Sequence, residues 1–205
     1  LGEFFESIGI FLMNGYGISE CSPLIAVNRR EHNDCTTVGF VLPCLEMKLL
    51  DVTEEGIGEI CVKGDNVMLG YYKRPDLTEE ALKDGWFATG DYGTLDPEGR
   101  LKITGRKKNM IVLTNGKNIY PEELEYHLGT DIRVGECLVL GDTNKKGELI
   151  VGARIFPNFD ELKERYGKEE KDFTDEELHS IFKEVVDAVN AKLPPFKAIL
   201  NFKVR

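Results

Sequence analysis

Two short stretches of the 205-residue sequence carry residue types that can bind a nucleotide. The first, Asn14-Gly15-Tyr16-Gly17-Ile18-Ser19-Glu20, places an aromatic ring, a hydroxyl and a carboxylate within five positions. The ring of Tyr16 can lie on a flat base, the hydroxyl of Ser19 can reach phosphate oxygens, and the carboxylate of Glu20 can bind Mg²⁺, a cation that prefers oxygen ligands. A tight surface turn is the alternative interpretation of the same residues.

The second stretch, Trp86-Phe87-Ala88-Thr89-Gly90-Asp91, ends in a carboxylate directly after a glycine. We place Asp91 at the end of a strand, where its carboxylate could accept hydrogen bonds from two ribose hydroxyls. An exposed loop aspartate is the alternative.

A third stretch is basic and runs from Gly105-Arg106-Lys107-Lys108-Asn109 to Thr114-Asn115-Gly116-Lys117-Asn118-Ile119-Tyr120-Pro121. Arg106 could reach a ribose or a phosphate, and a basic surface turn is the ordinary alternative. By contrast, the glycines around Gly58-Glu59-Ile60, Gly64 and Gly70-Tyr71-Tyr72 are explained by tight turns in β-structure, so we interpret that region as scaffold.

The first half of the chain reads as β-structure with one short helix. Strand-like runs occur near 38–43, 46–51, 58–64 and 99–105, separated by glycine-containing turns. The helix is expected near 76–83, with Asp76 or Thr78 as its N-cap.

The second half mixes strands and helices. A strand over 110–113 ends at the turn signal Asn115-Gly116, a helix begins at Pro121, and two strands follow near 136–141 and 148–156. Thr174 and Glu177 form a capping box for the last helix. Its inward face repeats apolar residues at helical spacing, namely Leu178, Ile181, Phe182, Val185, Val189 and Leu193.

Composition excludes several classes of protein. Apolar residues make up 41% and charged residues 30%, as in ordinary soluble domains, and the formal net charge of −10 disfavours nucleic acid and anionic membranes as partners. No apolar run approaches the roughly 20 residues of a membrane span, and the N-terminus lacks the basic region of a signal peptide. The five cysteines form no C-x-x-C pair, which predicts reduced thiols in a cytoplasmic protein.

In their order, NGYGISECSPL, WFATGD and GRKKNMIVLTNGKNIYPEELE resemble the acyl-adenylate-forming, or AMP-binding, superfamily. The resemblance covers essentially the whole chain and is strongest to bacterial long-chain fatty acid–CoA ligases. It implies an α/β fold combined with α+β structure. Residues 1–106 would form the β-rich, barrel-like end of the large AMP-binding domain, and residues 107–205 a small, mobile α+β domain that acts as a lid.

The resemblance also implies a role for individual residues. Tyr16 matches the aromatic that stacks on adenine, Ser19 stands where threonine is usual beside phosphate, and Glu20 matches the Mg²⁺ ligand. Asp91 and Arg106 match the two residues that contact the ribose.

Two further residues match positions linked to domain movement. Lys108 resembles the hinge about which the small domain rotates, and Gly116 the glycine that approaches the pantetheine arm of coenzyme A. No catalytic residue is assigned, because the chain ends before the expected adenylation lysine and contains no Ser/Thr/Gly-rich triphosphate loop. We therefore expect the fragment alone to be inactive.

The implied reaction is ATP-dependent, Mg²⁺-dependent activation of a fatty acid, followed by transfer to coenzyme A. Adenylation of an aryl or amino acid, or transfer to an acyl carrier protein, is the enzymatic alternative. A non-catalytic nucleotide-binding module is the alternative from another class.

Overall fold

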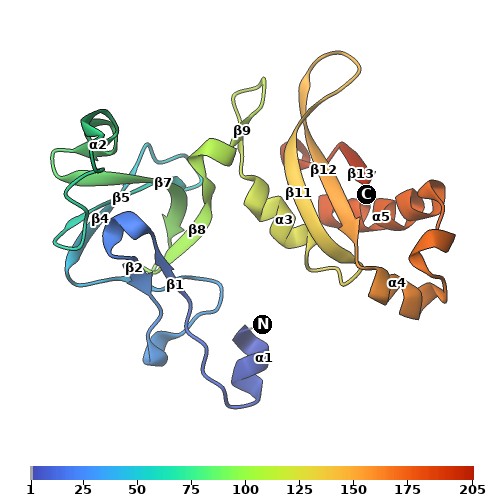
Figure 1. The fold of residues 1–205 in the computed structure, drawn as a ribbon, viewed down its shortest axis with the longest axis horizontal. Coiled ribbons are helices and arrows are strands. Elements are labelled where there is room, and N and C mark those ends of the chain that lie inside the picture. The colour runs from blue at the N-terminus through green and yellow to red at the C-terminus, as the bar shows by residue number, and fades with distance from the viewer. Residues whose placement is uncertain (1) are drawn as a thin grey trace. The chain divides into compact units, whose positions relative to one another are not determined.

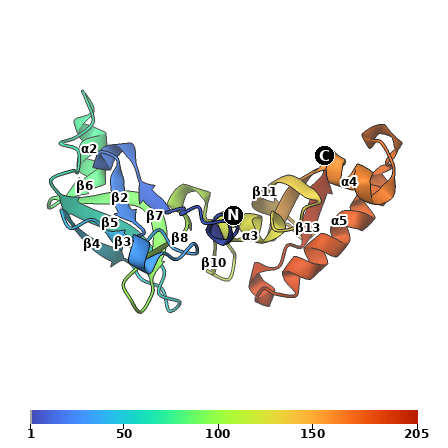
Figure 2. The same ribbon diagram turned by 90° about the horizontal axis from the view of Figure 1, so that it is seen from below.

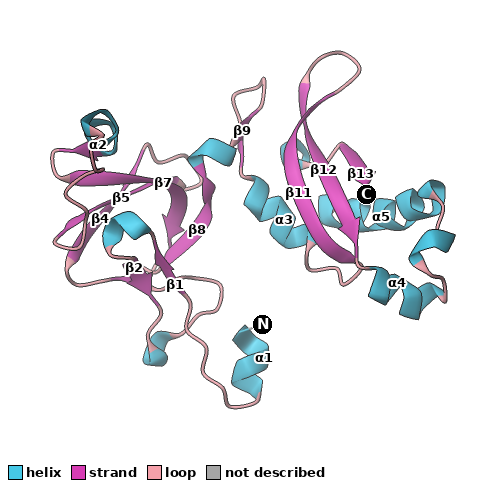
Figure 3. Ribbon diagram, viewed as in Figure 1, coloured by secondary structure: helices cyan, strands magenta, loops and turns pink. Residues whose placement is uncertain are grey.

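A computed structural model describes residues 2–205 of the chain. The chain divides into two compact units, Leu1–Lys108 (unit 1) and Asn109–Arg205 (unit 2). Unit 1 consists mostly of strands, whereas unit 2 combines strands with longer helices (Figure 3). No helix within residues 2–205 is long and apolar enough to cross a lipid bilayer.

The main sheet of unit 1 has the strand order β4-β5-β7-β6, with β8 beside β7 (Figure 1). Every pair in this sheet is antiparallel. The strands are β4 (Leu45–Leu50), β5 (Gly58–Gly64), β6 (Leu82–Lys83), β7 (Trp86–Leu95) and β8 (Leu101–Arg106). Shifts of register between Glu59 and Cys61 in β5 and between Tyr92 and Gly93 in β7 bend the centre of the sheet.

A smaller antiparallel sheet packs on the same core. It has the order β1-β2-β3, and the 3₁₀ turn η1 lies between its first two strands. Apolar side chains from both sheets form one buried cluster, which includes Ile25, Ile60, Val62, Phe87 and Leu101. The segments are β1 (Gly15–Gly17), η1 (Ser19–Cys21), β2 (Leu24–Val27) and β3 (Phe40–Val41); the short helix α1 (Gly2–Ser7) precedes them and η2 (Arg30–His32) lies between β2 and β3.

The predicted helix of unit 1 is present, but its predicted cap is wrong. Helix α2 spans Pro75–Ala81 and begins with proline, whose missing N–H and fixed φ suit the first helical position. Arg74 occupies the N-cap position and provides no side-chain cap. Thr78 instead accepts a hydrogen bond from the backbone N–H of Tyr71 through its Oγ1, at 2.9 Å.

Unit 2 is built on a three-stranded sheet of order β11-β12-β13. The first pair is antiparallel, and β13 runs parallel to β12. Helices α3 and α5 contact each other and the strands of this sheet, with the long α5 visible along its length in Figure 2. The elements are β9 (Ile111–Val112), β10 (Asn118–Ile119), α3 (Pro121–Leu128), β11 (Val134–Thr143), β12 (Leu149–Pro157), α4 (Phe159–Tyr166), η4 (Glu170–Asp172), α5 (Asp175–Asn190), η5 (Pro195–Lys197) and β13 (Asn201–Val204).

The strongest local signals of unit 2 are confirmed. The Asn115-Gly116 turn closes the β9–β10 hairpin, and Pro121 is the first residue of α3. Thr174 and Glu177 make both hydrogen bonds of the capping box at the start of α5. The side chain of Phe182 is completely buried among residues of α3, α4 and the sheet. Five of the six predicted apolar residues lie on α5 and pack in this core, as expected, whereas the helix ends at Asn190 and Leu193 packs against the core from beyond it.

Replacing Thr174 by alanine should lower the free energy of unfolding by about 1 kcal/mol, because the N–H of Glu177 then loses its side-chain acceptor. Urea unfolding followed by circular dichroism measures the change. The exposed Thr114, which lies in a turn, provides the matched control through Thr114→Ala. Equal stability of the two variants would contradict the role given to the cap.

Candidate functional site

The buried carboxylate of Asp91 is the centre of the site. Asp91 and Arg106 face each other across the β7–β8 pair, and the guanidinium Nε lies 3.1 Å from Asp91 Oδ1. The hydroxyl of Tyr16, on β1, donates a hydrogen bond of 2.7 Å to Asp91 Oδ2. The side chain of Asp91 is 5% exposed, whereas that of Arg106 is 53% exposed.

These contacts leave Asp91 able to accept more hydrogen bonds. A carboxylate offers about four lone-pair sites, and Tyr16 and Arg106 use one on each oxygen. Burial and the nearby Asp91 charge raise the pKa of Tyr16 far above its ordinary value, so its phenol remains a neutral donor. The contacts of Tyr16 and Arg106 thus occupy one position on each carboxylate oxygen and leave a second lone pair on each.

The expected position of Asp91 at a strand end is wrong. Strand β7 continues for four residues beyond it, to Leu95, so Asp91 lies inside the strand. Gly90, directly before it, has φ +73°, a conformation that glycine adopts without strain. The chain therefore departs locally from regular β geometry where the carboxylate is placed.

Glu20 lies in the turn η1 that connects β1 to β2. The hydroxyl of Tyr71 donates a hydrogen bond of 2.9 Å to its Oε1. Among residues 2–205 no group of three or more His, Cys, Asp or Glu side chains could enclose a metal ion. A single carboxylate fits Mg²⁺ that is held mainly by the phosphates of a nucleotide, since Mg²⁺ is commonly bound by one or two carboxylates together with substrate oxygens.

A cleft of about 1040 Å³ in unit 1 brings several of the predicted residues together. Glu20, Asp91, Arg106 and Lys108 all line it. Tyr16 borders this cleft only through its hydrogen bond to Asp91, and the exposed Ser19 is not part of its lining. The remaining polar lining includes Lys48, Asp51, Glu59, Tyr71, Lys83 and Lys107.

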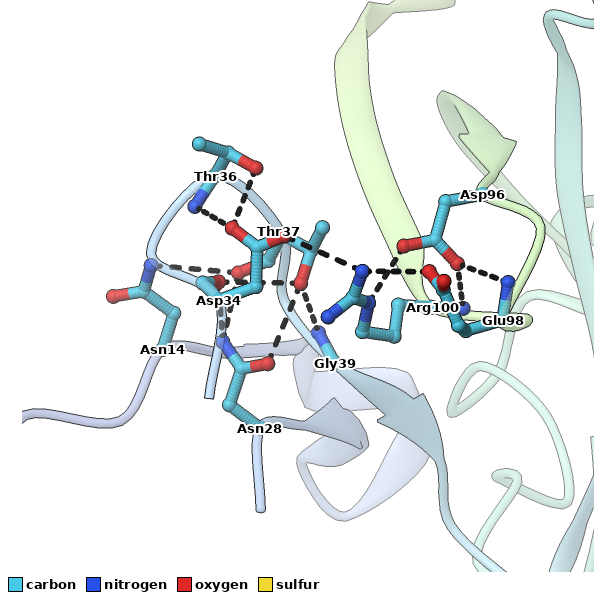
Figure 4. Close-up of polar contacts among 9 residues, drawn as sticks. All are labelled: Asn14, Asn28, Asp34, Thr36, Thr37, Gly39, Asp96, Glu98 and Arg100. Atoms are coloured by element: carbon cyan, nitrogen blue, oxygen red, sulfur yellow. Dashed lines mark hydrogen bonds and ion pairs between the residues drawn. The ribbon is translucent and has the colours of Figure 1, made fainter. Parts of the chain in front are cut away.

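A polar cluster around Arg100 connects the strand of Tyr16 to the hairpin of Asp91 (Figure 4). At the tip of the β7–β8 hairpin, the guanidinium of Arg100 contacts the carboxylates of Asp34, Asp96 and Glu98, at 3.5, 2.6 and 2.7 Å. Asp34 begins a turn whose backbone carbonyls accept hydrogen bonds from the side chains of Asn14 and Asn28, which flank β1 and β2. This chain of contacts keeps β1 in position relative to β7.

The residues next to the predicted hinge are anchored on one side. Lys107 Nζ lies 2.6 Å from Glu59 Oε2, and the Glu59 side chain is only 6% exposed. The hydrogen bond that Lys107 donates to this carboxylate raises the pKa of Lys107. Lys108 follows in the exposed 3₁₀ turn Lys107–Asn109, where unit 1 ends. The chain is thus fixed to unit 1 up to the residue before Lys108.

Gly116 lies in unit 2, at the tip of the β9–β10 hairpin. Its φ is +77°, and a Cβ added there would meet no atom of the chain within 4 Å. The positive φ of the turn thus favours glycine at this position, and the space around it is open.

All five cysteines are free. Burial raises the pKa of Cys21, beside Glu20, to about 11. Its thiol is thus protonated near neutral pH and is no candidate nucleophile.

Comparison with known families agrees with this fold. Residues 1–72 match the model of the AMP-binding enzyme family, and residues 108–205 match the AMP-binding enzyme C-terminal domain. The chain belongs to the AMP-binding enzyme family.

Several relatives of similar sequence are named long-chain-fatty-acid–CoA ligases. The ligase of Salmonella typhimurium is 46% identical over 123 residues, which are 57% of this chain and 22% of that protein. The ligase of Yersinia pestis is 41% identical over 158 residues, 73% of this chain and 28% of that protein. The chain thus spans about a quarter of the length of these relatives.

Solved structures show the same fold. The o-succinylbenzoate CoA synthetase of Bacillus subtilis, in complex with its acyl-adenylate intermediate, is 29% identical with a TM-score of 0.78. The match covers 99% of this chain and 39% of that one. The same enzyme has been solved with ATP and magnesium ion. The predicted fold class, a β-rich end of the AMP-binding domain followed by a small α+β domain, is confirmed.

Two residues of the cleft were interpreted from sequence as scaffold. Glu59 and Tyr71 belong to the glycine-rich stretches that turns explain, yet Glu59 pairs with Lys107 and Tyr71 contacts Glu20. The only sequence signal was a polar residue directly beside a glycine in each stretch.

Proposed function

We propose that the intact protein activates a long-chain fatty acid with ATP and transfers the acyl group to coenzyme A. The observation that carries the proposal is the buried Asp91 carboxylate, held by Tyr16 and Arg106 with one acceptor site on each oxygen at the cleft. The names of the relatives support the fatty acid and coenzyme A as substrates.

In the first step a carboxylate oxygen of the fatty acid attacks the α-phosphorus of ATP. The bond from the α-phosphorus to the bridging oxygen breaks, which gives the acyl-adenylate and pyrophosphate. Asp91 accepts hydrogen bonds from the ribose, Arg106 contacts the same sugar, and Tyr16 stacks on adenine while Ser19 reaches a phosphate. Glu20 would hold Mg²⁺, which when bound neutralises charge on the phosphate oxygens.

In the second step the thiol sulfur of coenzyme A attacks the acyl carbon. The bond from the acyl carbon to the AMP oxygen breaks, AMP leaves, and the thiol proton is released. Unit 2 acts as the small domain, which rotates about Lys108 between the two steps so that the Gly116 turn approaches the pantetheine arm. We assign no catalytic residue within residues 1–205. We place the activity of the intact protein in the cytoplasm.

Exchange between ATP and pyrophosphate tests the first step. The intact protein is incubated with a panel of fatty, aromatic and amino acids, and labelled pyrophosphate entering ATP is counted. We expect exchange that depends on long-chain fatty acids. A folded protein that binds ATP and exchanges with no acid would contradict the proposal in favour of a non-catalytic nucleotide-binding module.

The same chemistry on another acid is the second candidate. Its support is the structural match to a synthetase named for o-succinylbenzoate, an aromatic acid. Pyrophosphate exchange with aromatic or amino acids alone would favour this candidate. If an acyl carrier protein replaced coenzyme A in the second step, only the acceptor of the acyl group would change.

Gly116→Asn should slow thioester formation on the order of 10-fold, because the added side chain displaces the pantetheine arm from its reactive position. Asparagine tolerates positive φ, so the turn itself should persist. Gly147→Asn is the matched control: Gly147 has φ +79°, lies in the turn after β11, and likewise has open space at its Cβ position. Acyl-CoA formation from pre-formed acyl-adenylate measures the effect, and equal rates in the two variants would refute the role of Gly116.

A further inference from the structure

The carboxylate of Glu20 is held from outside its own turn. Tyr71 comes 51 residues later in the chain, and its hydroxyl donates to Glu20 Oε1 at 2.9 Å. Both residues line the cleft that contains Asp91 and Arg106. The contact thus joins the candidate Mg²⁺ ligand to a side chain that has no role of its own in the proposed reaction.

The segment that carries Tyr71 makes two further hydrogen bonds, one to the Glu20 turn and one to the start of β2. The backbone N–H of Met68 donates to the carbonyl oxygen of Glu20 at 2.7 Å, and Asn66 Nδ2 donates to the carbonyl oxygen of Leu24 at 2.9 Å. The Met68 bond holds the main chain of Glu20 and the phenol of Tyr71 its side chain, while the Asn66 bond holds the same segment to β2.

Tyr71 is itself positioned from both sides. Its backbone N–H donates to Thr78 Oγ1 on α2, and Thr78 Oγ1 donates to the carbonyl oxygen of Arg74. Gly70, before it, has φ +150°, and a Cβ at that position would lie 2.7 Å from Thr78 Cγ2. The phenol therefore approaches Glu20 from a segment with little freedom to move.

We propose that Tyr71 is a positioning residue that orients the Glu20 carboxylate toward nucleotide-bound Mg²⁺. The hydroxyl occupies one carboxylate oxygen and fixes its direction, which leaves the other oxygen free to meet the cation. Outer partners of metal-binding side chains act in this way and typically contribute 10- to 100-fold to metal affinity. This inference rests on the proposed function, because Glu20 needs a metal–nucleotide substrate.

Nucleotide binding with and without metal tests the inference independently of turnover. The dissociation constant of ATP for the intact protein is measured by calorimetry in excess Mg²⁺ and again in EDTA. The ratio of the two constants is the contribution of the metal. We expect Tyr71→Phe to reduce that ratio about 10-fold and to leave the constant in EDTA unchanged.

The neighbouring Tyr72 gives a matched control. Tyr72 is 86% exposed, so Tyr72→Phe removes the same hydroxyl at a site without Glu20 and should keep the wild-type ratio. In a Glu20→Gln background, Tyr71→Phe should cause no further change, because the side chain that it orients no longer binds the metal.

Each other outcome overturns a defined statement. A wild-type ratio in Tyr71→Phe overturns the positioning role. Equal weakening in Mg²⁺ and in EDTA also overturns it, since that result indicates a purely structural contribution. A folded wild-type protein that binds ATP under neither condition overturns the proposed function, and this inference with it.

Discussion

Asp91→Ala should raise the KM for ATP of the intact protein about 100-fold. Two hydrogen bonds from ribose hydroxyls to a charged acceptor disappear, and together they contribute about 3 kcal/mol. The substitution also removes the acceptor of Tyr16 and the partner of Arg106. Initial rates of pyrophosphate exchange at varied ATP concentration measure the change.

Asp76→Ala is the control for this prediction. Asp76 also pairs with an arginine, Arg74, but both side chains are more than half exposed, and neither lines the cleft of Asp91. Its KM for ATP should equal that of the wild type. An unchanged KM in Asp91→Ala, from a protein that melts at the wild-type temperature, would refute the ribose-binding role.

Lys108→Pro should preserve adenylate formation and slow thioester formation about 100-fold. Proline fixes φ near −65°, and forcing it where another φ is needed costs about 3 kcal/mol or more. Because the ion pair between Lys107 and Glu59 anchors the preceding residue, Lys108 is the first residue free to absorb a rotation. The two half-reactions are measured separately, by pyrophosphate exchange and by acyl-CoA formation from acyl-adenylate.

Lys108→Ala separates the backbone effect from the loss of the side chain. Alanine removes the same ammonium group but leaves φ and ψ free, so it should retain both half-reactions. Equal loss of thioester formation in Lys108→Ala and Lys108→Pro would assign the effect to the side chain, and loss of both half-reactions in Lys108→Pro would exclude a hinge.

Local sequence signals predicted the elements that depend on neighbouring residues. The capping box of Thr174 and Glu177 and the Asn115-Gly116 turn are both present, because each is formed by residues a few positions apart. Strand β13 and helix α4 were not predicted. β13 is a four-residue strand that forms only by pairing in parallel with β12, a pairing that no local pattern specifies.

The residues of the site were easier to predict than their contacts. Tyr16, Glu20, Asp91 and Arg106 were named from motifs, and the structure places three of them along one cleft with Tyr16 bonded to Asp91. Their pairings depend on strand register, which shifts in β5 and in β7, and these irregularities have no clear sequence mark. The contact of Tyr71 with Glu20 joins two segments outside the strands that lie 51 residues apart, a pairing that no local pattern specifies.

The cluster around Arg100 gives the site an acid limit. Hydrogen bonds from Thr36 hold the pKa of Asp34 below its usual range. At Asp96, burial raises the pKa, but hydrogen bonds from Arg100 outweigh it, and the net pKa is lowered. Carboxylates with depressed pKa values stabilise the fold above their unfolded pKa, and this contribution disappears as the pH falls through the folded value. Acidification is therefore expected to loosen the turn that keeps β1 in position, which would disturb the proposed nucleotide site through protonation of residues outside it.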